Sequence, residues 1–437
     1  WEAGGDYEYE FNNGSKYRFL FIVNSGQYDS TRERFNILAD REEKDLFLYS
    51  EGRDQERIFR TSYTWDPLTS HGLEMGVERA ETIRDSDLRL GMAGFGSPSL
   101  NHGNLPPISI DNSDSIVKEM RYENFLVHNW RVSDKVSVES SLTYETSNIK
   151  QAGDIFNKRD FDFLRPKIDY RYDITQSTQL RAKIEKRVSQ LSFRDFSASS
   201  DSQDDDQNTQ AGNPEIVQEQ SWEYSLNLEY RFPNNLGVFN SELYYRDIED
   251  VIDLVNVSTS PDDLRSARGN IGDAYRYGLR LDASTRLGFI GLPTALLNVN
   301  LSLQDSEVTD PFLGTERRLR FNSRWFGRSS FRHDITRWDL SYGLNYFNSD
   351  NDSDARMQID INDIEREIRD YGLSMFVEKK ASNGVTFRLN VMNANDPQRC
   401  RERTRFLGAT VNGIVEEIED YCSGYGIQYA LNASYTF

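Results

Sequence analysis

Long hydrophobic runs are absent from this sequence. No stretch of about 18 consecutive apolar residues occurs in its 437 residues, which excludes a helical membrane protein. Mean hydropathy is low, at −0.70, yet aromatic residues make up 12% of the chain, with 23 Tyr and 25 Phe. A disordered chain would be poor in aromatics. Low hydropathy with many aromatics is typical of a transmembrane β-barrel, in which only alternate residues face lipid.

Basic residues are outnumbered by acidic ones. The chain has 51 Lys and Arg against 71 Asp and Glu, a net charge of −20. Nucleic acid is therefore not an expected partner, because phosphate binding needs clustered basic residues. Acidic residues gather in polar stretches such as 201–206, which contains Asp201, Asp204, Asp205 and Asp206. We interpret this stretch as a solvated loop; a divalent-cation site near lipopolysaccharide is the alternative.

Histidines are few, and catalytic motifs are missing. The four histidines are scattered without metal-ligand spacing: His71, His102, His128 and His333. No serine nucleophile elbow, P-loop or Cys-x-x-Cys motif is present. The sequence therefore predicts a protein that is not an enzyme and needs no cofactor. A membrane-embedded hydrolase with its active site among loop residues is the alternative that spacing does not test.

Only two cysteines occur, Cys400 and Cys422, in one segment near the C-terminal end. An even number in an exported protein permits a disulfide; two free thiols are the alternative. The bridge would close a loop of about 20 residues and stabilise it by about 3 kcal/mol on chain-entropy estimates. We expect its role to be structural.

The dominant signal is an alternation of apolar and polar residues. The clearest example is residues 222–232, whose apolar members are Trp222, Tyr224, Leu226, Leu228, Tyr230 and Phe232. Similar alternation recurs in residues 167–174, 276–283, 297–304 and 340–345. A β-strand with this pattern places its apolar groups on one face and its polar groups on the other. We predict about 17 strands, with an error of about two.

The connections between these strands alternate in length. Short polar turns are expected near residues 12–14, 132–135, 175–178, 233–236 and 382–384. Long polar stretches lie between them, at about 91–115, 148–160, 191–217, 257–270, 348–362 and 395–424. A soluble sandwich would not sort its loops by length so regularly, whereas outer-membrane barrels do. Within the fifth stretch and beyond it, residues 359–368 fit either a short helix or an extension of a strand.

The polar face of the predicted strands carries many charges, including Lys167, Asp169, Glu223, Glu229 and Arg280. Burying an unpaired charge in a dry core costs several kcal/mol, and barrels of sixteen or more strands enclose water or a plug. The opposite, aromatic and aliphatic face would be an aggregation hazard in water. The sequence therefore predicts an all-β fold: a large antiparallel transmembrane β-barrel with a wide, hydrated lumen.

The C-terminal strand continues the alternation to the last residue. Tyr429, Leu431, Tyr435 and Phe437 share one face with Ala433. A terminal Phe that closes an alternating strand resembles the signal read by the outer-membrane barrel assembly machinery. We expect these four large side chains to act as the assembly signal.

Several segments resemble TonB-dependent receptors. Residues 164–181 look like the mid-barrel hairpin of that family, and residues 187–195 are also typical of it. Residues 212–224 begin with Gly-Asn-Pro and are similar to a family stretch that precedes a Tyr-rich strand, although Gln218 replaces the usual second proline. Residues 389–393 resemble part of the penultimate strand. The resemblance covers most of residues 1–437 and is strongest over 164–255 and 384–437.

The resemblance implies a receptor of the bacterial outer membrane that takes up a scarce, bulky solute with energy from the TonB complex. Candidate solutes are iron–siderophores, vitamins such as cobalamin, haem and oligosaccharides. Implied partners are outer-membrane lipid and lipopolysaccharide, the TonB complex, the barrel assembly machinery and the small-molecule or oligosaccharide ligand. Family members carry an N-terminal plug preceded by a TonB-binding box. Because neither is found in this sequence, we expect residues 1–437 to form one barrel domain of about 16–18 strands out of 22, without the plug and the first strands.

Two other functions remain open. A passive, porin-like channel would have no plug and no TonB box. A surface barrel that binds ligand without transporting it would behave identically with and without TonB. If the ligand is a saccharide, we expect aromatic residues of the loops to bind it. The candidates are Phe193, Phe196, Phe312, Phe326 and Tyr421, and packing within the loops is the alternative role for each.

Overall fold

The computed structural model describes residues 1–437 apart from 111, 201–208, 261–263, 351–355, 383 and 436–437. The acidic stretch 201–206 and the terminal Phe437 therefore lie outside the described residues. Within the described part of the chain, no helix has both the length and the apolar character needed to cross a membrane.

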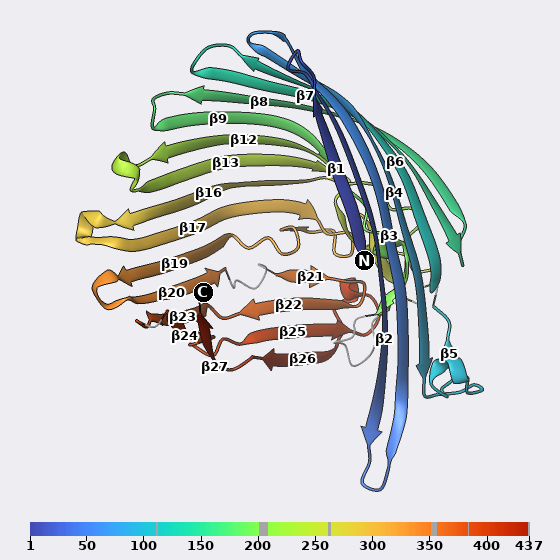
Figure 1. The fold of residues 1–437 in the computed structure, drawn as a ribbon. Coiled ribbons are helices and arrows are strands. Elements are labelled where there is room, and N and C mark those ends of the chain that lie inside the picture. The colour runs from blue at the N-terminus through green and yellow to red at the C-terminus, as the bar shows by residue number, and fades with distance from the viewer. Residues whose placement is uncertain (111, 201–208, 261–263, 351–355, 383, 436–437) are drawn as a thin grey trace.

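Seventeen long strands form one antiparallel sheet (Figure 1), which agrees with the predicted 16–18. Each strand pairs with the next in this order: β1 (Glu2–Glu10), β2 (Lys16–Ile37), β3 (Glu42–Leu68), β4 (His71–Met92), β6 (Asp114–Arg131), β7 (Val136–Gly153), β8 (Asn157–Asp173), β9 (Thr178–Val188), β12 (Gln220–Arg231), β13 (Gly237–Glu249), β16 (Ala274–Leu287), β17 (Leu292–Thr309), β19 (Trp325–Ile335), β20 (Leu340–Ser349), β23 (Gly372–Lys380), β24 (Val385–Met392) and β27 (Gln428–Tyr435). Two strands of two residues, β5 (Pro107–Ile108) and β18 (Glu316–Arg317), bring the sheet to nineteen.

The remaining strands lie in the long connections. They form the pairs β10 (Ser199–Ser200) with β11 (Thr209–Gln210) and β14 (Ile252–Asn256) with β15 (Ser266–Asn270). A separate four-stranded sheet contains β21 (Met357–Ile359), β22 (Asp363–Arg369), β25 (Arg399–Phe406) and β26 (Val415–Ser423). Residues 359–368 are thus largely strand, and the stretch expected to be the loop 395–424 contains a hairpin. In these segments, polar residues of neighbouring strands pair with each other. A polar composition alone therefore does not distinguish a loop from a strand.

The sheet has short turns at one end and long loops at the other, as the sequence predicts (Figure 1). We call these the turn end and the loop end. The short turns span residues 11–15, 69–70, 132–135, 174–177, 232–236, 288–291, 336–339 and 381–384. The β2–β3 hairpin is the longest, with 22 and 27 residues in its strands, and it extends far past its neighbours at the loop end (Figure 1).

The two faces of the sheet differ as predicted. On β12, Tyr224 and Leu226 are 42% and 44% exposed, whereas Glu223 is buried. Glu223 is held on the polar face by Arg246 of β13 at 2.7 Å and by Lys183 of β9 at 3.2 Å. These cross-strand pairs satisfy charges that would otherwise oppose packing. The alternation in the sequence therefore does separate an apolar face from a charged one.

The polar face is the inside of the curled sheet. The connection between β9 and β12 folds back over it, so that Phe193 and Phe196 pack against Val117 of β6 and Ile149 of β7. Because side chains alternate along a strand, Val117 and Ile149 lie on the same face of the sheet as the charged residues. At the two edges of the sheet, β1 pairs only with β2 and β27 only with β24 among the described residues. The sheet is thus an antiparallel, partly wrapped barrel wall (Figure 1).

Candidate functional site: the loop-end assembly and its arginine-lined pocket

Two of the long loops are joined by a buried ion-pair network. Arg317 of β18 lies between Asp253 of β14 and Asp310, with nitrogen–oxygen distances of 2.9 and 2.7 Å. None of the three side chains is more than 7% exposed. Removing one partner from such a network leaves an uncompensated buried charge, which is strongly unfavourable. These two ion pairs therefore hold the β13–β16 and β17–β19 connections together.

The four-stranded sheet is built from complementary charges. Its register places acidic residues of β22 beside basic residues of β25. Arg401 contacts Glu365 at 2.8 Å, and Arg399 contacts Glu367 at 2.5 Å. Because side chains alternate between the two faces of a strand, these residues lie on the same face. The sequence signal for this face is the spacing of the arginines in β25, which occupy positions 399, 401, 403 and 405.

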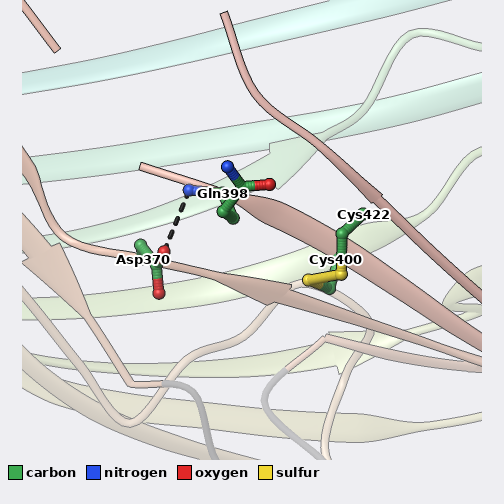
Figure 2. Close-up of a disulfide and its surroundings, with 4 residues drawn as sticks. All are labelled: Asp370, Gln398, Cys400 and Cys422. Carbon is green, nitrogen blue, oxygen red and sulfur yellow. Dashed lines mark hydrogen bonds between the residues drawn. A yellow bond between two sulfur atoms is a disulfide. The ribbon is translucent and has the colours of Figure 1, made fainter. Parts of the chain in front are cut away.

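A disulfide and two hydrogen bonds fasten the end of this sheet at which β25 begins (Figure 2). Cys400 of β25 and Cys422 of β26 are opposite each other in the register and are joined through their sulfur atoms. The backbone N–H of Gln398 donates to the carboxylate of Asp370 at 2.9 Å, and the backbone N–H of Asp370 donates to the carbonyl of Gln398 at 3.0 Å. The start of β25 is thus held to both β26 and the end of β22.

A buried aspartate anchors the other end of the sheet. Asp360 follows β21 and has no exposed surface. Its backbone carbonyl accepts a hydrogen bond from the hydroxyl of Thr410 at 2.8 Å. Its carboxylate accepts a hydrogen bond from the side chain of Ser266 in β15. Burial raises the pKa of Asp360 to about 6, and the nearby Asp363 carboxylate adds to the increase. This anchor is therefore sensitive to pH in the mildly acidic range.

A pocket of about 680 Å³ separates the four-stranded sheet from the extended part of β2. Arg32 of β2 lines it on one side. The sheet lines it mainly with alternating side chains, which include Glu365, Glu367, Arg399, Arg401, Arg403, Glu419 and Tyr421. Figure 1 shows β2 passing beside the ends of these strands. The pocket therefore joins segments that are more than three hundred residues apart in the chain.

Arg32 differs from the other arginines of the pocket. Among the described residues it contacts no carboxylate, and its terminal nitrogen Nη1 has no hydrogen-bond partner. Arg399 and Arg401, in contrast, already contact carboxylates. An arginine fork without an acidic partner can bind a carboxylate or a similar planar anion with two parallel hydrogen bonds. Arg32 is therefore the side chain of this pocket with spare capacity for a ligand, and the sequence analysis missed it because nothing local distinguishes it.

The five predicted ligand-binding aromatics do not come together. Tyr421 is exposed and lines the pocket with Arg32. Phe193 and Phe196 are buried under the β9–β12 connection. Phe312 is half-buried beside β18, and Phe326 of β19 packs against another ring, with centroids 5.3 Å apart. A role in ligand binding stays a prediction for each, with Tyr421 in the position best suited to it.

The predicted assembly-signal residues lie on the edge strand β27. Tyr429, Leu431 and Tyr435 are all exposed on one face of this strand. The strand β27 is paired with β24 along one of its two backbone edges. Their recognition by the assembly machinery stays a prediction.

The sequence matches a family model described as the TonB-dependent receptor-like β-barrel, over residues 1–394. The chain is a member of the TonB-dependent receptor family. The family resides in the outer membrane and consists of transporters and receptors rather than enzymes. The comparison of this receptor with curated proteins gave no match.

Solved structures share the fold of the receptor. A copper transporter superposes with a TM-score of 0.69 at 14% identity, covering 100% of this chain and 65% of that one. The ferric yersiniabactin uptake receptor of Yersinia pestis gives a TM-score of 0.62 at 13% identity, covering 96% and 60%. The pyoverdine receptor of Pseudomonas aeruginosa, bound to pyoverdine, gives 0.65 at 9% identity, covering 99% and 61%. The receptor described here thus spans less than two thirds of the length of each.

Proposed function

We propose that this receptor imports a scarce, bulky solute across the outer membrane with energy supplied through TonB. Membership of the family supports the class of activity, and similar folds serve proteins named for the uptake of ferric yersiniabactin and ferric citrate. We further propose that residues 1–437 act as one barrel domain whose loop end faces the outside of the cell. The short turns would then face the periplasm, as in other outer-membrane barrels.

The pocket between Arg32 and the four-stranded sheet is the observation that carries this proposal. It lies at the loop end, where a solute would first reach the lumen. Its volume of about 680 Å³ falls in the range of small-molecule sites. It offers the unpaired Nη1 of Arg32 and an exposed ring from Tyr421. These groups would hold a large polar solute before it enters the charged interior.

Uptake measured with and without TonB tests the proposal. The intact protein would be expressed in otherwise matched strains that carry or lack TonB, and each strain would be given labelled ferric siderophores, cobalamin, haem or maltodextrins. We expect one solute to accumulate only when TonB is present. Accumulation that is proportional to concentration and independent of TonB would instead indicate a passive channel. Binding without accumulation in both strains would indicate a surface binding barrel.

Replacing Arg32 tests the role of the pocket. Arg32→Ala should raise the KM for uptake by roughly tenfold or more, because a hydrogen bond to a charged group contributes about 1.5–3 kcal/mol. Arg41→Ala is the matched control, since Arg41 lies at the tip of the same hairpin and its contacts are exposed. Equal KM values for both variants would remove Arg32 from the site.

A further inference from the structure

The strand β26 is an exposed edge of the four-stranded sheet at the loop end. Among the described residues it pairs only with β25, and Figure 1 shows it as the outermost strand of that sheet. Eight of its nine residues are exposed. No described strand pairs with the N–H and C=O groups of its other edge, and such an edge is a template for the addition of a further strand.

This edge lacks most of the features by which proteins prevent strand addition. β26 contains no Lys and no Pro, which are the residues that commonly protect an edge. Its register shifts once, opposite Arg405 and Phe406, and residues 417–423 are paired regularly. The disulfide between Cys400 and Cys422 fixes the end of this regular part. A strand that is fixed before it binds loses less conformational freedom on binding.

The edge is acidic. β26 has no basic residue and carries four carboxylates: Glu416, Glu417, Glu419 and Asp420. The sequence from 406 to 437 contains no Lys, Arg or His at all. Any basic residue that neutralises these carboxylates must therefore come from another strand.

The neighbouring strand β25 neutralises only part of this charge. Three of its four arginines contact carboxylates of β22. Among the described residues, only Arg405 forms an ion pair with β26, through Glu419 at 3.1 Å. On the opposite face, the register places Glu402 of β25 directly beside Asp420. Like charges in this position destabilise a sheet, so a cation next to Asp420 would offset the repulsion.

The distribution of charge selects the kind of strand that fits this edge. A second copy of β26 would place carboxylates beside carboxylates, which opposes pairing. A strand with alternating basic residues would instead continue the order of the sheet, in which the basic strand β25 lies between the acidic strands β22 and β26. The edge is therefore protected against self-association and remains open to a cationic strand.

We propose that β26 binds an extended cationic segment of a partner polypeptide as an additional strand. Backbone hydrogen bonds supply the affinity, and the carboxylates of β26 supply the selectivity. The β25–β26 hairpin lies beyond residues 1–394, which the family model matches, so membership of the family does not assign this role. The proposal does not require the receptor to transport a solute.

Peptide binding to the intact protein in detergent tests the proposal. The probe is a peptide of about nine residues, the length of β26, in which Lys alternates with Thr and Val. One control peptide has Pro in place of the Thr and Val residues, because Pro keeps the charge but removes backbone donors. A second control has Glu in place of Lys. We expect the Lys peptide to bind at least about tenfold more tightly than either control, since several ladder hydrogen bonds are involved.

Replacing two carboxylates of β26 tests their part in the selectivity. Glu417→Gln/Asp420→Asn should raise the Kd of the Lys peptide by about fourfold, because each exposed ion pair changes an equilibrium constant by roughly twofold. Asp40→Asn/Glu42→Gln is the matched control, since both residues are exposed beside the tip of the β2–β3 hairpin. This control should leave the Kd unchanged. Heat-modifiable migration in gels checks that both variants fold.

Hydrogen exchange locates the bound peptide. Binding should slow the exchange of amides in residues 417–423 and leave the amides of β12 and β13 unchanged. Four outcomes would overturn the proposal: no binding of the Lys peptide, equal affinity for the Lys and Pro peptides, equal Kd values for the two variants, or slower exchange that does not include β26.

The peptide comparison and the exchange measurement need no variant, so the proposal stays testable if a variant fails to fold. Neither measurement needs TonB or a transported solute. The peptide-binding edge and the uptake function can therefore fail separately.

Discussion

Replacing Cys400 and Cys422 by serine tests how the four-stranded sheet keeps its shape. The bridge joins opposite positions of β25 and β26, which are 22 residues apart in the chain. Arg405 and Glu419 also connect these strands, at 3.1 Å, and the backbone ladder is continuous on both sides of the bridge. We therefore expect the double serine variant to keep the sheet but to open it more often.

The magnitude follows from the length of the closed loop. In the chain-entropy model, a cross-link over about 22 residues lowers the free energy of the closed hairpin relative to the open one by about 3 kcal/mol. The lost burial adds little, because the half-cystine at 422 is exposed. A difference of about 3 kcal/mol corresponds to roughly a 150-fold change in the opening equilibrium.

Hydrogen exchange of the intact protein measures this change directly. Amides of β25 and β26 should exchange about two orders of magnitude faster in the variant, whereas amides of β12 and β13 in the barrel wall should be unaffected. Wild-type protein treated with a reductant should behave like the variant. An increase below threefold in β25 and β26 would refute the reasoning. Equal acceleration in the barrel wall would show that the bridge stabilises the whole fold instead.

Three further predictions concern charge and burial. Because the pKa of Asp360 is raised to about 6 from 3.8, the stability of its turn should be greatest below about pH 4 and should fall by about 3 kcal/mol as pH rises through 6; Asp360→Asn should remove this dependence in pH-resolved hydrogen exchange. Arg317→Met should lower the free energy of unfolding by about 3–5 kcal/mol in a denaturant titration, since it leaves two buried carboxylates without their cation. Arg41→Met should lower it by about 1 kcal/mol or less. Equal losses in the two variants would contradict the assignment of a buried network. Leu226→Arg should destabilise the barrel by about 2–4 kcal/mol because it places a charge against lipid, while Asn227→Arg on the polar face should be nearly neutral; the opposite order would reverse the two faces.

The barrel wall was predictable because its signal is local. Alternation of apolar and polar residues, as in residues 222–232, has a period of two that any extended strand must respect. The alternating loop lengths indicated the antiparallel connectivity. The residue alternation and the loop lengths together predicted the strand number and the identity of the two faces. The same rule was insufficient for residues 399–406, where alternating charges form a strand in a stretch that composition alone marks as a loop.

The site depended on tertiary structure because its members are brought together by strands far apart in sequence. Arg32 reaches the arginines of β25 only because the β2–β3 hairpin extends across the loop end. The contact of Glu223 with Arg246 exists only in one register, since a slip of one residue on β12 would turn Glu223 to the outer face. The hydrophobic pattern of the whole sheet fixes that register, so cross-strand neighbours are a property of the fold and not of any single segment.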